Sequence, residues 1–251
     1  MMTLVLVALA VAPGVAFAMY ISYRDNQEKE PIRLLLRAFL IGFIIVAPVS
    51  LAEAGLRDAW NLSTRNIFHL FIDNYIVIGF TEEVVKFFIL WAVVYNRREF
   101  SQPYDGILYG VMVGMGFATS ENIAVVLESG LKTALLRLVT TMPAHWIFAV
   151  LMGYFVGLSK FRNHSGRMIT MGIVTATLFH GTYDFCLSIE NIPLIGGGAV
   201  ISLGLGIYLS FKAIQRLLET DPMRVLKMLG AHEVHEQPVK EEEAVKEEQP
   251  V

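Results

Sequence analysis

Long apolar stretches run through most of the chain and constrain its fold more than any other feature. We count seven, at about 2–22, 33–52, 67–95, 106–127, 134–159, 168–189 and 196–217. A helix needs about 20 mostly apolar residues to cross the hydrocarbon core of a bilayer. Charged residues make up only 17% of the chain, whereas a soluble domain has about 25%. The sequence therefore predicts an all-α, polytopic bundle of about seven transmembrane helices in the cell membrane.

Positive charge is spread unevenly over the polar segments between these stretches. Alternate segments are rich in Lys and Arg, and the rich set includes the C-terminal one, with Lys212, Arg216, Arg224 and Lys227. Because cytoplasmic loops carry the excess of Lys and Arg, this pattern predicts an outer N-terminus and an inner C-terminus. The first stretch has no positively charged start, so we expect a retained span and not a cleaved signal peptide.

The composition changes near residue 218. Residues 1–218 hold all seven apolar stretches and are expected to form one transmembrane domain. Residues 219–251 are acidic, contain Pro and lack aromatic side chains, which predicts a disordered cytoplasmic tail. No basic stripe with interleaved aromatic residues is present, so we expect no nucleic-acid partner. Cys186 is the only cysteine, which excludes a disulfide within the chain.

Charged residues inside the third stretch form the first candidate for function. Glu82, Glu83 and Lys86 lie in the run Gly79-Phe-Thr-Glu-Glu-Val-Val-Lys86. The spacings of three and four residues place Lys86 on one helix face with both carboxylates. One Glu and one Lys would suffice for a buried ion pair that only fixes packing. The second carboxylate favours a general acid or base.

Three more apolar stretches each carry ionisable residues, which are costly there and usually face the interior of a bundle. Glu121 lies in the fourth stretch, and His145, which follows Pro143, lies in the fifth. The sixth holds His180 and Asp184, four residues apart and therefore on one helix face. Each residue alone is compatible with packing. Together they indicate a polar site within the membrane.

The depths of these residues support one common site. At a rise of 1.5 Å per residue, Glu82 and Glu121 each lie roughly 22 Å from the start of their spans, which run in opposite directions. His145 lies roughly 16 Å and His180 roughly 18 Å into theirs, by the same measure. All four are expected in a layer between the midplane and the outer half of the membrane.

Two further pairs of ionisable residues lie closer to the ends of the predicted spans. Glu53 and Arg57 follow the second stretch, and His69 and Asp73 begin the third. We interpret both pairs as boundary residues that contact headgroups and water.

The residues in the apolar stretches are suited to activating water for peptide hydrolysis. Glu82 or Glu83 can take a proton from water, and a histidine can share that task or stabilise the oxyanion. The alternative is a zinc ion held by His145, His180 and a carboxylate, for which Asp184 is the candidate. The sequence has no His-Glu-x-x-His motif, and Ser120 has no evident base partner.

Four motifs occur in the order found in the PrsW family, which resembles the type II CAAX prenyl proteases. They are Glu82-Glu83-x-x-Lys86, Phe117-x-x-x-Glu121-Asn122, His145 followed by Gly153, and His180-Gly-x-x-Asp184. The resemblance covers about Gly79 to Phe185. It implies that Glu82, Glu83, Glu121, His145, His180 and Asp184 are site residues, and we add Lys86 of the first motif as a further catalytic candidate. Glu121 stands where the CAAX enzymes have a histidine, so their scheme for activating water does not transfer directly.

The resemblance also implies an activity for residues 1–218. It is that of a membrane protease of the site-1 kind, which cleaves a single-pass membrane protein such as an anti-sigma factor near its outer boundary. Family descriptions name a metalloprotease, with a metal-free glutamate mechanism as the rival. The residues themselves leave two other classes open, a non-catalytic scaffold or immunity-type protein and a proton-coupled transporter.

Overall fold

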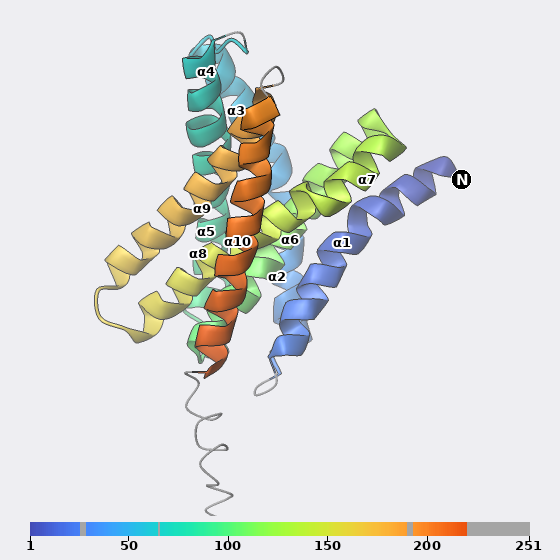
Figure 1. Cartoon of the computed structure of the whole chain (residues 1–251). Helices are drawn as coiled ribbons and strands as arrows, with labels where there is room; N and C mark the ends of the chain where they lie inside the picture. The colour runs from blue at the N-terminus through green and yellow to red at the C-terminus, as the bar shows by residue number, and fades with distance from the viewer. Residues whose placement is uncertain (26–28, 65, 190–192, 220–251) are drawn as a thin grey trace, which may run out of the picture.

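The structure, a computed structural model, describes residues 1–25, 29–64, 66–189 and 193–219. Within these ranges every regular element is a helix (Figure 1). The elements are α1 (Met2–Arg24), α2 (Ile32–Ile44), α3 (Val46–Ala59), α4 (Ile67–Ile72), η1 (Asp73–Phe80), α5 (Thr81–Leu90), η2 (Trp91–Tyr95), α6 (Pro103–Ser129), α7 (Leu131–Val139), α8 (Thr141–Phe161), α9 (Ser165–Ser188) and α10 (Pro193–Glu219). The predicted disordered tail lies, apart from Glu219, outside the described residues.

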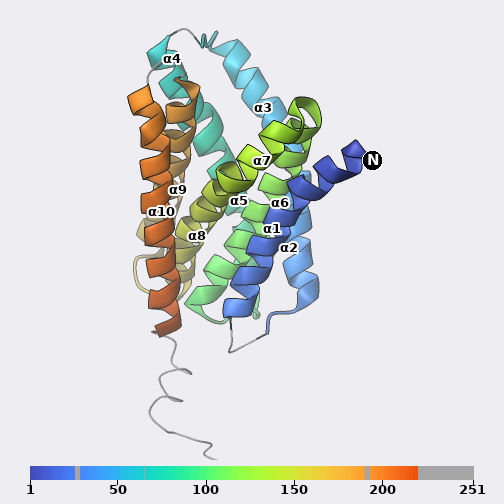
Figure 2. The same cartoon turned by 45° about the vertical axis from the view of Figure 1, so that its right-hand side comes forward.

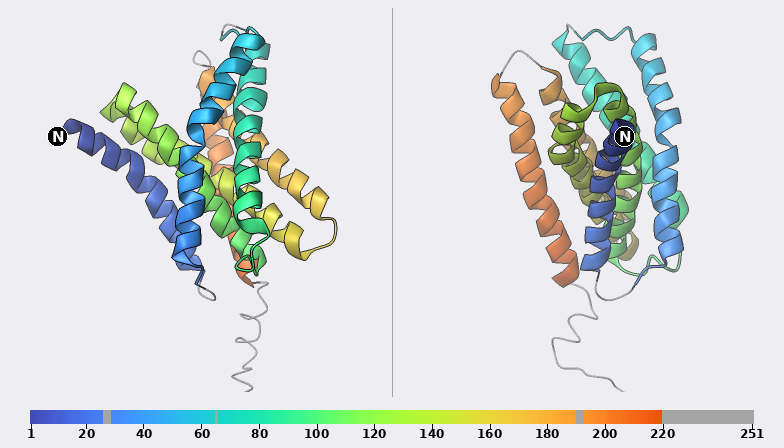
Figure 3. Two further views of the ribbon diagram at one scale, coloured as in Figure 1. Left: turned by 180° about the vertical axis from the view of Figure 1, so that it is seen from behind. Right: turned by 90° about the vertical axis from the view of Figure 1, so that its right-hand side faces the viewer.

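Among the described residues, five helices are long and apolar enough to cross a membrane, which confirms a polytopic all-α membrane protein. They are α1, the nearly continuous α2–α3, α6, α7–α8 and most of α10. The other two predicted spans correspond to the rod from α4 to η2 and to α9, which run beside these five (Figure 3). These two elements carry Glu82, Glu83, Lys86, His180 and Asp184, and such side chains lower the apolar character of a helix.

Helix α6 forms the centre of the bundle. Every residue from Tyr104 to Thr119 is buried. Its main neighbours are α1, α2 and α8, which surround it on different sides (Figure 2). A helix that is apolar on all sides belongs in such a position. Helix α6 therefore provides a fixed support for Glu121 near its C-terminal end.

Glycines bring α6 and α8 into backbone contact. A Cβ atom on Gly153 of α8 would lie 2.3 Å from the carbonyl oxygen of Gly106 on α6, and one on Gly110 would lie 3.1 Å from the oxygen of Ala149. Small residues are the usual means of close helix approach in membranes, where lipid leaves no hydrophobic drive between helices. The contact fixes the position of His145, which lies two turns before Gly153 on α8.

We expect the Gly153→Ala substitution to destabilise the protein by about 1–3 kcal/mol, because the new methyl group meets backbone atoms that no side-chain rotation can move. The measurement is the thermal unfolding midpoint in detergent. Gly204→Ala in α10 is the matched control, since a Cβ atom there has nothing within 4 Å. An unchanged midpoint in Gly153→Ala would show that the two helices separate at little cost.

The predicted fifth span is divided in the structure. Helix α7 ends at Val139 and α8 begins at Thr141, with Thr140 between them at φ −121° and ψ −73°. Pro143 lies in the first turn of α8, where its missing N–H would have no helical partner in any case. The sequence pattern did not reveal this break, because apolar residues continue through it. The break lets α7 turn Arg137 toward the end of α6.

Candidate active site

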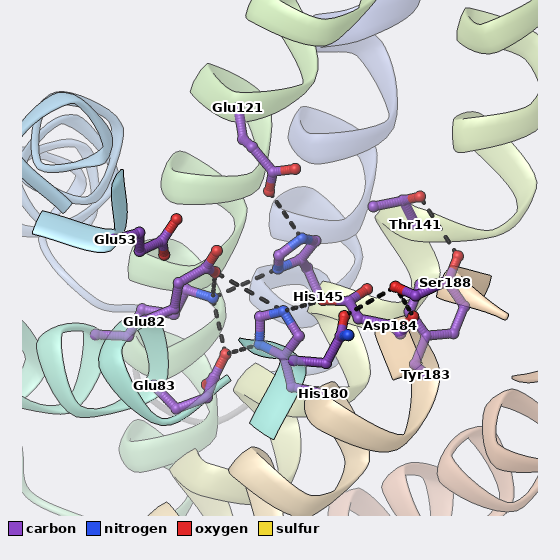
Figure 4. A network of polar contacts seen from close by, with 12 residues as sticks. Glu53, Glu82, Glu83, Glu121, Thr141, His145, His180, Tyr183, Asp184 and Ser188 are labelled. Carbon is purple, nitrogen blue, oxygen red and sulfur yellow. Dashed lines mark hydrogen bonds and ion pairs between the residues drawn. The ribbon is translucent and has the colours of Figure 1, made fainter. Parts of the chain in front are cut away.

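A polar cavity of about 270 Å³ lies among seven helical elements, from α3 to α9. Its polar side chains are Ser50, Glu53, Arg57, Glu82, Glu121, Arg137, Thr141, His145, His180, Tyr183 and Asp184. Two larger grooves, of about 560 and 410 Å³, have mainly apolar walls. Such walls suit contacts with lipid or with an apolar helix. The polar cavity is therefore the place where acid–base or metal chemistry can occur (Figure 4).

Lys86 joins the two carboxylates of the first motif. Its Nζ donates to Glu82 Oε2 at 2.9 Å and to Glu83 Oε1 at 2.8 Å. The ammonium also lies 4.3 Å from the centre of the Phe117 ring. All three charged side chains are buried. The spacing of three and four residues on α5 thus has the expected result, with both carboxylates meeting one cation.

His180 of α9 is held by Glu83. The imidazole Nδ1 lies 2.9 Å from Glu83 Oε1, and because a carboxylate accepts hydrogen bonds, Nδ1 carries the proton in this contact. Glu83 is fully buried and does not line the cavity. It therefore serves to orient His180 and has no route to a water molecule in the cavity. A carboxylate behind a ligating histidine is common in metal sites.

The other nitrogen of His180 faces two carboxylates. Nε2 lies 3.1 Å from Asp184 Oδ2 and 3.9 Å from Glu82 Oε2. With the proton on Nδ1, Nε2 carries a lone pair, which repels carboxylate oxygens. A positive charge at this point, either a second proton or a metal ion, removes the repulsion. The surroundings of His180 Nε2 are therefore those of a cation site.

His145 of α8 is held in a similar way by Glu121. Its Nε2 lies 3.1 Å from Glu121 Oε2, and its Nδ1 lies 3.4 Å from Lys86 Nζ. Because an ammonium donates and a carboxylate accepts, the proton belongs on Nε2 and the lone pair on Nδ1. That lone pair points toward Lys86 and Glu82 (Figure 4). Glu121 therefore contacts His145, and pairing with a histidine is one of the two roles that its sequence position suggests.

Arg137 of α7 holds Glu121 in turn. Its Nη2 donates to Glu121 Oε1 at 2.8 Å, and its Nε donates to Asn122 Oδ1 at 2.7 Å. The Asn122 amide donates to the backbone oxygen of Ala10 on α1. Helix α7 is therefore connected to α1 through Asn122 and to His145 through Glu121.

One group of side chains has the spacing of metal ligands. Glu82, His145 and His180 each offer one donor atom, and these three atoms lie within 4.8 Å of one another. Two imidazoles and one carboxylate form a donor set of catalytic zinc sites. The residues present therefore fit a bound divalent metal, with Glu82 in the position that the sequence assigned to Asp184.

The balance of charge supports the same reading. Four carboxylates, those of Glu82, Glu83, Glu121 and Asp184, lie within 4 Å of one or both histidines or of Lys86. The permanent cations that contact them are Lys86 and Arg137. Buried charges are costly unless they are paired. A divalent cation among these side chains would remove the excess of negative charge.

The structure brings all seven predicted site residues together. Glu82, Glu121, His145, His180 and Asp184 line the cavity, while Glu83 and Lys86 lie behind it. His69, a predicted boundary residue, is not among the cavity residues, whereas Glu53 and Arg57, predicted to be boundary residues, are. Sequence reasoning also missed Arg137, whose only signal was a cation within an apolar stretch.

The sequence also matches a protein family. The family described as "PrsW family intramembrane metalloprotease" matches residues 30–214. The chain belongs to the PrsW family. It is 34% identical to "Protease PrsW" of Bacillus subtilis (strain 168) over 185 residues, which are 73% of this chain and 83% of that protein. No solved structure matches.

Other relatives carry the same description. The chain is 35% identical to "Protease PrsW" of Shouchella clausii over 185 residues, 73% of this chain and 83% of the relative. It is 32% identical to "Protease PrsW" of Clostridioides difficile over 201 residues, 75% of this chain and 82% of the relative.

Membership of the family decides among the classes that the sequence left open. This PrsW-family protein is an intramembrane metalloprotease, a hydrolase, which favours the protease class over the scaffold and transporter classes. Its localisation to a membrane, with multiple spans, is confirmed by the same finding and by the five apolar helices. Its substrate is a membrane protein, as expected for an enzyme of this family.

Proposed function

We propose that this enzyme cleaves a single-pass membrane protein of the anti-sigma-factor type near its outer membrane boundary, as a site-1 protease. The observation that carries the proposal is the convergence of Glu82, His145 and His180 at a polar cavity within an apolar bundle. Residues 1–218 form the protease domain. The reaction is hydrolysis of one peptide bond by an activated water molecule.

Glu82, His145 and His180 are the residues that would hold the metal, and zinc is the metal that this donor set favours. When bound, it supplies Lewis-acid polarisation of the carbonyl and a more acidic water. Glu83 and Glu121 would hold the two imidazoles in place through His180 Nδ1 and His145 Nε2. Asp184 lies beside the same nitrogen of His180 and can accept a hydrogen bond from a bound water.

The position of the cavity supports cleavage near the outer boundary. Its walls include Arg57, Arg137 and Leu187, which lie at or near the ends of α3, α7 and α9. The ends of α3 and α9 lie toward the same side of the bundle as the N-terminus, whereas α7 runs from that side toward the middle (Figure 1). That side is the outer one by the distribution of Lys and Arg. A substrate segment that enters from this side reaches the cluster without crossing the whole membrane.

The proposal is tested with protein purified in detergent and a single-pass anti-sigma-type reporter. Wild type, Glu82→Ala and His145→Ala are compared for cleavage, and the zinc content of each is measured. We expect cleavage and stoichiometric zinc in wild type only. Cleavage without metal would instead support water activated by glutamate alone. Cleavage by all three proteins would contradict the assigned site, and no cleavage by wild type would contradict the assigned substrate class.

We expect Arg137→Met to lower both turnover and zinc affinity by about 10–100-fold, the usual effect of removing an outer partner of a metal ligand. The substitution keeps the length of the side chain but frees Glu121, which then no longer fixes His145. Arg137→Lys should recover part of the loss, because an ammonium cannot bridge Glu121 and Asn122 as the guanidinium does. Zinc titration and reporter cleavage measure the two effects.

Arg162→Met is the control for this substitution. Arg162 is exposed beyond the end of α8, at the opposite end of that helix from His145. The same chemical change there should leave zinc affinity and turnover unaltered. Equal losses in the two variants would mean that Arg137 acts through general charge and not through Glu121.

A further inference from the structure

Glu53 of α3 is buried in the cavity wall without a close partner for one of its oxygens. The residue is 8% exposed, and its Oε1 is shielded from solvent and has no hydrogen-bond partner within the described residues. Its Oε2 lies 3.9 Å from Arg57 Nη1, while the Arg57 Nε makes a much shorter contact, 2.7 Å, with Asp73. A buried carboxylate oxygen without a partner is costly, so its presence needs a reason.

The polar cavity that Glu53 faces gives a reason for this buried carboxylate oxygen without a partner. Its carboxylate points toward Glu82 and the histidine pair from the α3 side (Figure 4), and it lines the same cavity. A cavity of about 270 Å³ has room for several water molecules, each of which takes about 30 Å³ in the liquid. The Glu53 side chain therefore borders the space that water and the scissile peptide would occupy.

The other carboxylates of the site already have partners. Glu83 is held by Lys86 and His180, and Glu121 is held by Arg137 and His145. Asp184 contacts His180 Nε2, and Glu82 is one of the three donors that fit a metal. If Glu82 acts as a ligand, Glu82, Glu83 and Glu121 are all engaged, and Asp184, which can contact a bound water, lies on the same helix as His180.

We propose that Glu53 is a further catalytic residue, the carboxylate that carries the proton from the attacking water to the leaving amine. This proposal rests on the proposed hydrolysis at the same site. The water oxygen forms a bond to the carbonyl carbon, and one water proton moves to the Glu53 carboxylate. The carbon–nitrogen bond then breaks, and the same proton moves to the nitrogen. One peptide and one water become a carboxylic acid and an amine, and Glu53 returns to its initial state.

Helix α3 can place a carboxylate for this role because it lines a different side of the cavity from the helices that carry the four sequence motifs. The four sequence motifs lie on α5, α6, α8 and α9. Glu53 thus stands across the cavity from the two histidines and does not compete with them for the same donor position. A proton carrier must lie within hydrogen-bond reach of the water and of the leaving group, and a position across the cavity permits both contacts.

The test compares Glu53→Gln, Glu53→Asp and wild type on the single-pass anti-sigma-type reporter, with zinc content and thermal unfolding measured for each. We expect Glu53→Gln to lower kcat by about 10²–10⁴-fold, the usual contribution of general acid–base catalysis. KM, zinc content and the unfolding temperature should stay at wild-type values. Glu53→Asp keeps a carboxylate and should be at least about tenfold faster than Glu53→Gln by the same argument.

The control is Asp58→Asn, which removes a carboxylate from an exposed position of the same helix. It should behave as wild type. A kcat in Glu53→Gln within about threefold of wild type would overturn the proposal, because general acid–base catalysis contributes far more. Loss of zinc or a lower unfolding temperature in both Glu53 variants would also overturn it, since the role of Glu53 would then be structural. Failure of the proposed hydrolysis is seen separately, as cleavage by Glu82→Ala or none by wild type.

Discussion

Replacing His180 by alanine is expected to lower the rate of peptide-bond cleavage by about 10³-fold or more, because Lewis-acid stabilisation contributes several kcal/mol and each 1.36 kcal/mol is a factor of ten. The metal should be lost in the same variant. His180 supplies one of the three donor atoms of the cluster and lies between Glu83, Asp184 and Glu82. Without the imidazole, these carboxylates no longer frame a nitrogen ligand.

The measurement combines reporter cleavage with metal analysis of the purified variant, and His164→Asn is its control. His164 is exposed in the loop between α8 and α9 and has a left-handed backbone, with φ +68°. Asparagine tolerates that conformation, so this variant removes an imidazole without straining the chain. It should retain its metal and its rate. A His180→Ala enzyme that still bound one metal ion and cleaved normally would exclude this histidine from the site.

The sequence identified the residues of the candidate site better than it predicted the contacts among them. Ionisable residues are unfavourable in an apolar span, so several of them in neighbouring spans indicate a candidate functional site. The depth argument placed Glu121 and His145 at one level from opposite directions, and their side chains meet at 3.1 Å. Fixed spacing within one helix was equally informative, since Glu82 and Glu83 both reach Lys86.

Roles that depend on contacts between helices could not be derived in this way. Which carboxylate faces a given histidine depends on the rotation of each helix about its axis. The sequence suggested Asp184 as a metal ligand because it shares a face with His180. The structure places Glu82 in the donor group instead, across a helix interface that no spacing rule describes. Glu121 could have contacted either a catalytic water or a histidine, and it lies between Arg137 and His145.

The positions of helix ends are the second feature in which the structure differs from the sequence-based predictions. Glu53 follows an apolar stretch and was taken for a boundary residue. In the structure α3 continues beyond it to Ala59, which keeps Glu53 inside the bundle. The break at Thr140 was hidden for the opposite reason, because apolar residues extend across it. Hydropathy locates the lipid-facing part of a chain, but it does not show where a helix bends or ends.

The second large effect is expected from Lys86→Met. Lys86 is 3% exposed and is the ammonium partner of both Glu82 and Glu83. Its removal leaves two buried carboxylates without that partner, while methionine fills most of the volume. Breaking a buried ion pair from one side typically costs about 3–5 kcal/mol, because the charge that remains is uncompensated. We therefore expect a clear fall in the thermal unfolding temperature of the metal-free protein in detergent.

A second substitution separates this charge effect from a loss of packing. The double variant Lys86→Met, Glu83→Gln has one stranded carboxylate fewer and should regain part of the lost stability, whereas a packing defect would persist or grow. Lys132→Met, at an exposed position of α7, provides the control for the chemical change itself. If Lys86→Met unfolded at the wild-type temperature, the two carboxylates would need another source of compensation. Addition of zinc distinguishes that case, because a metal bound by Glu82 stabilises the folded state in proportion to its affinity and concentration.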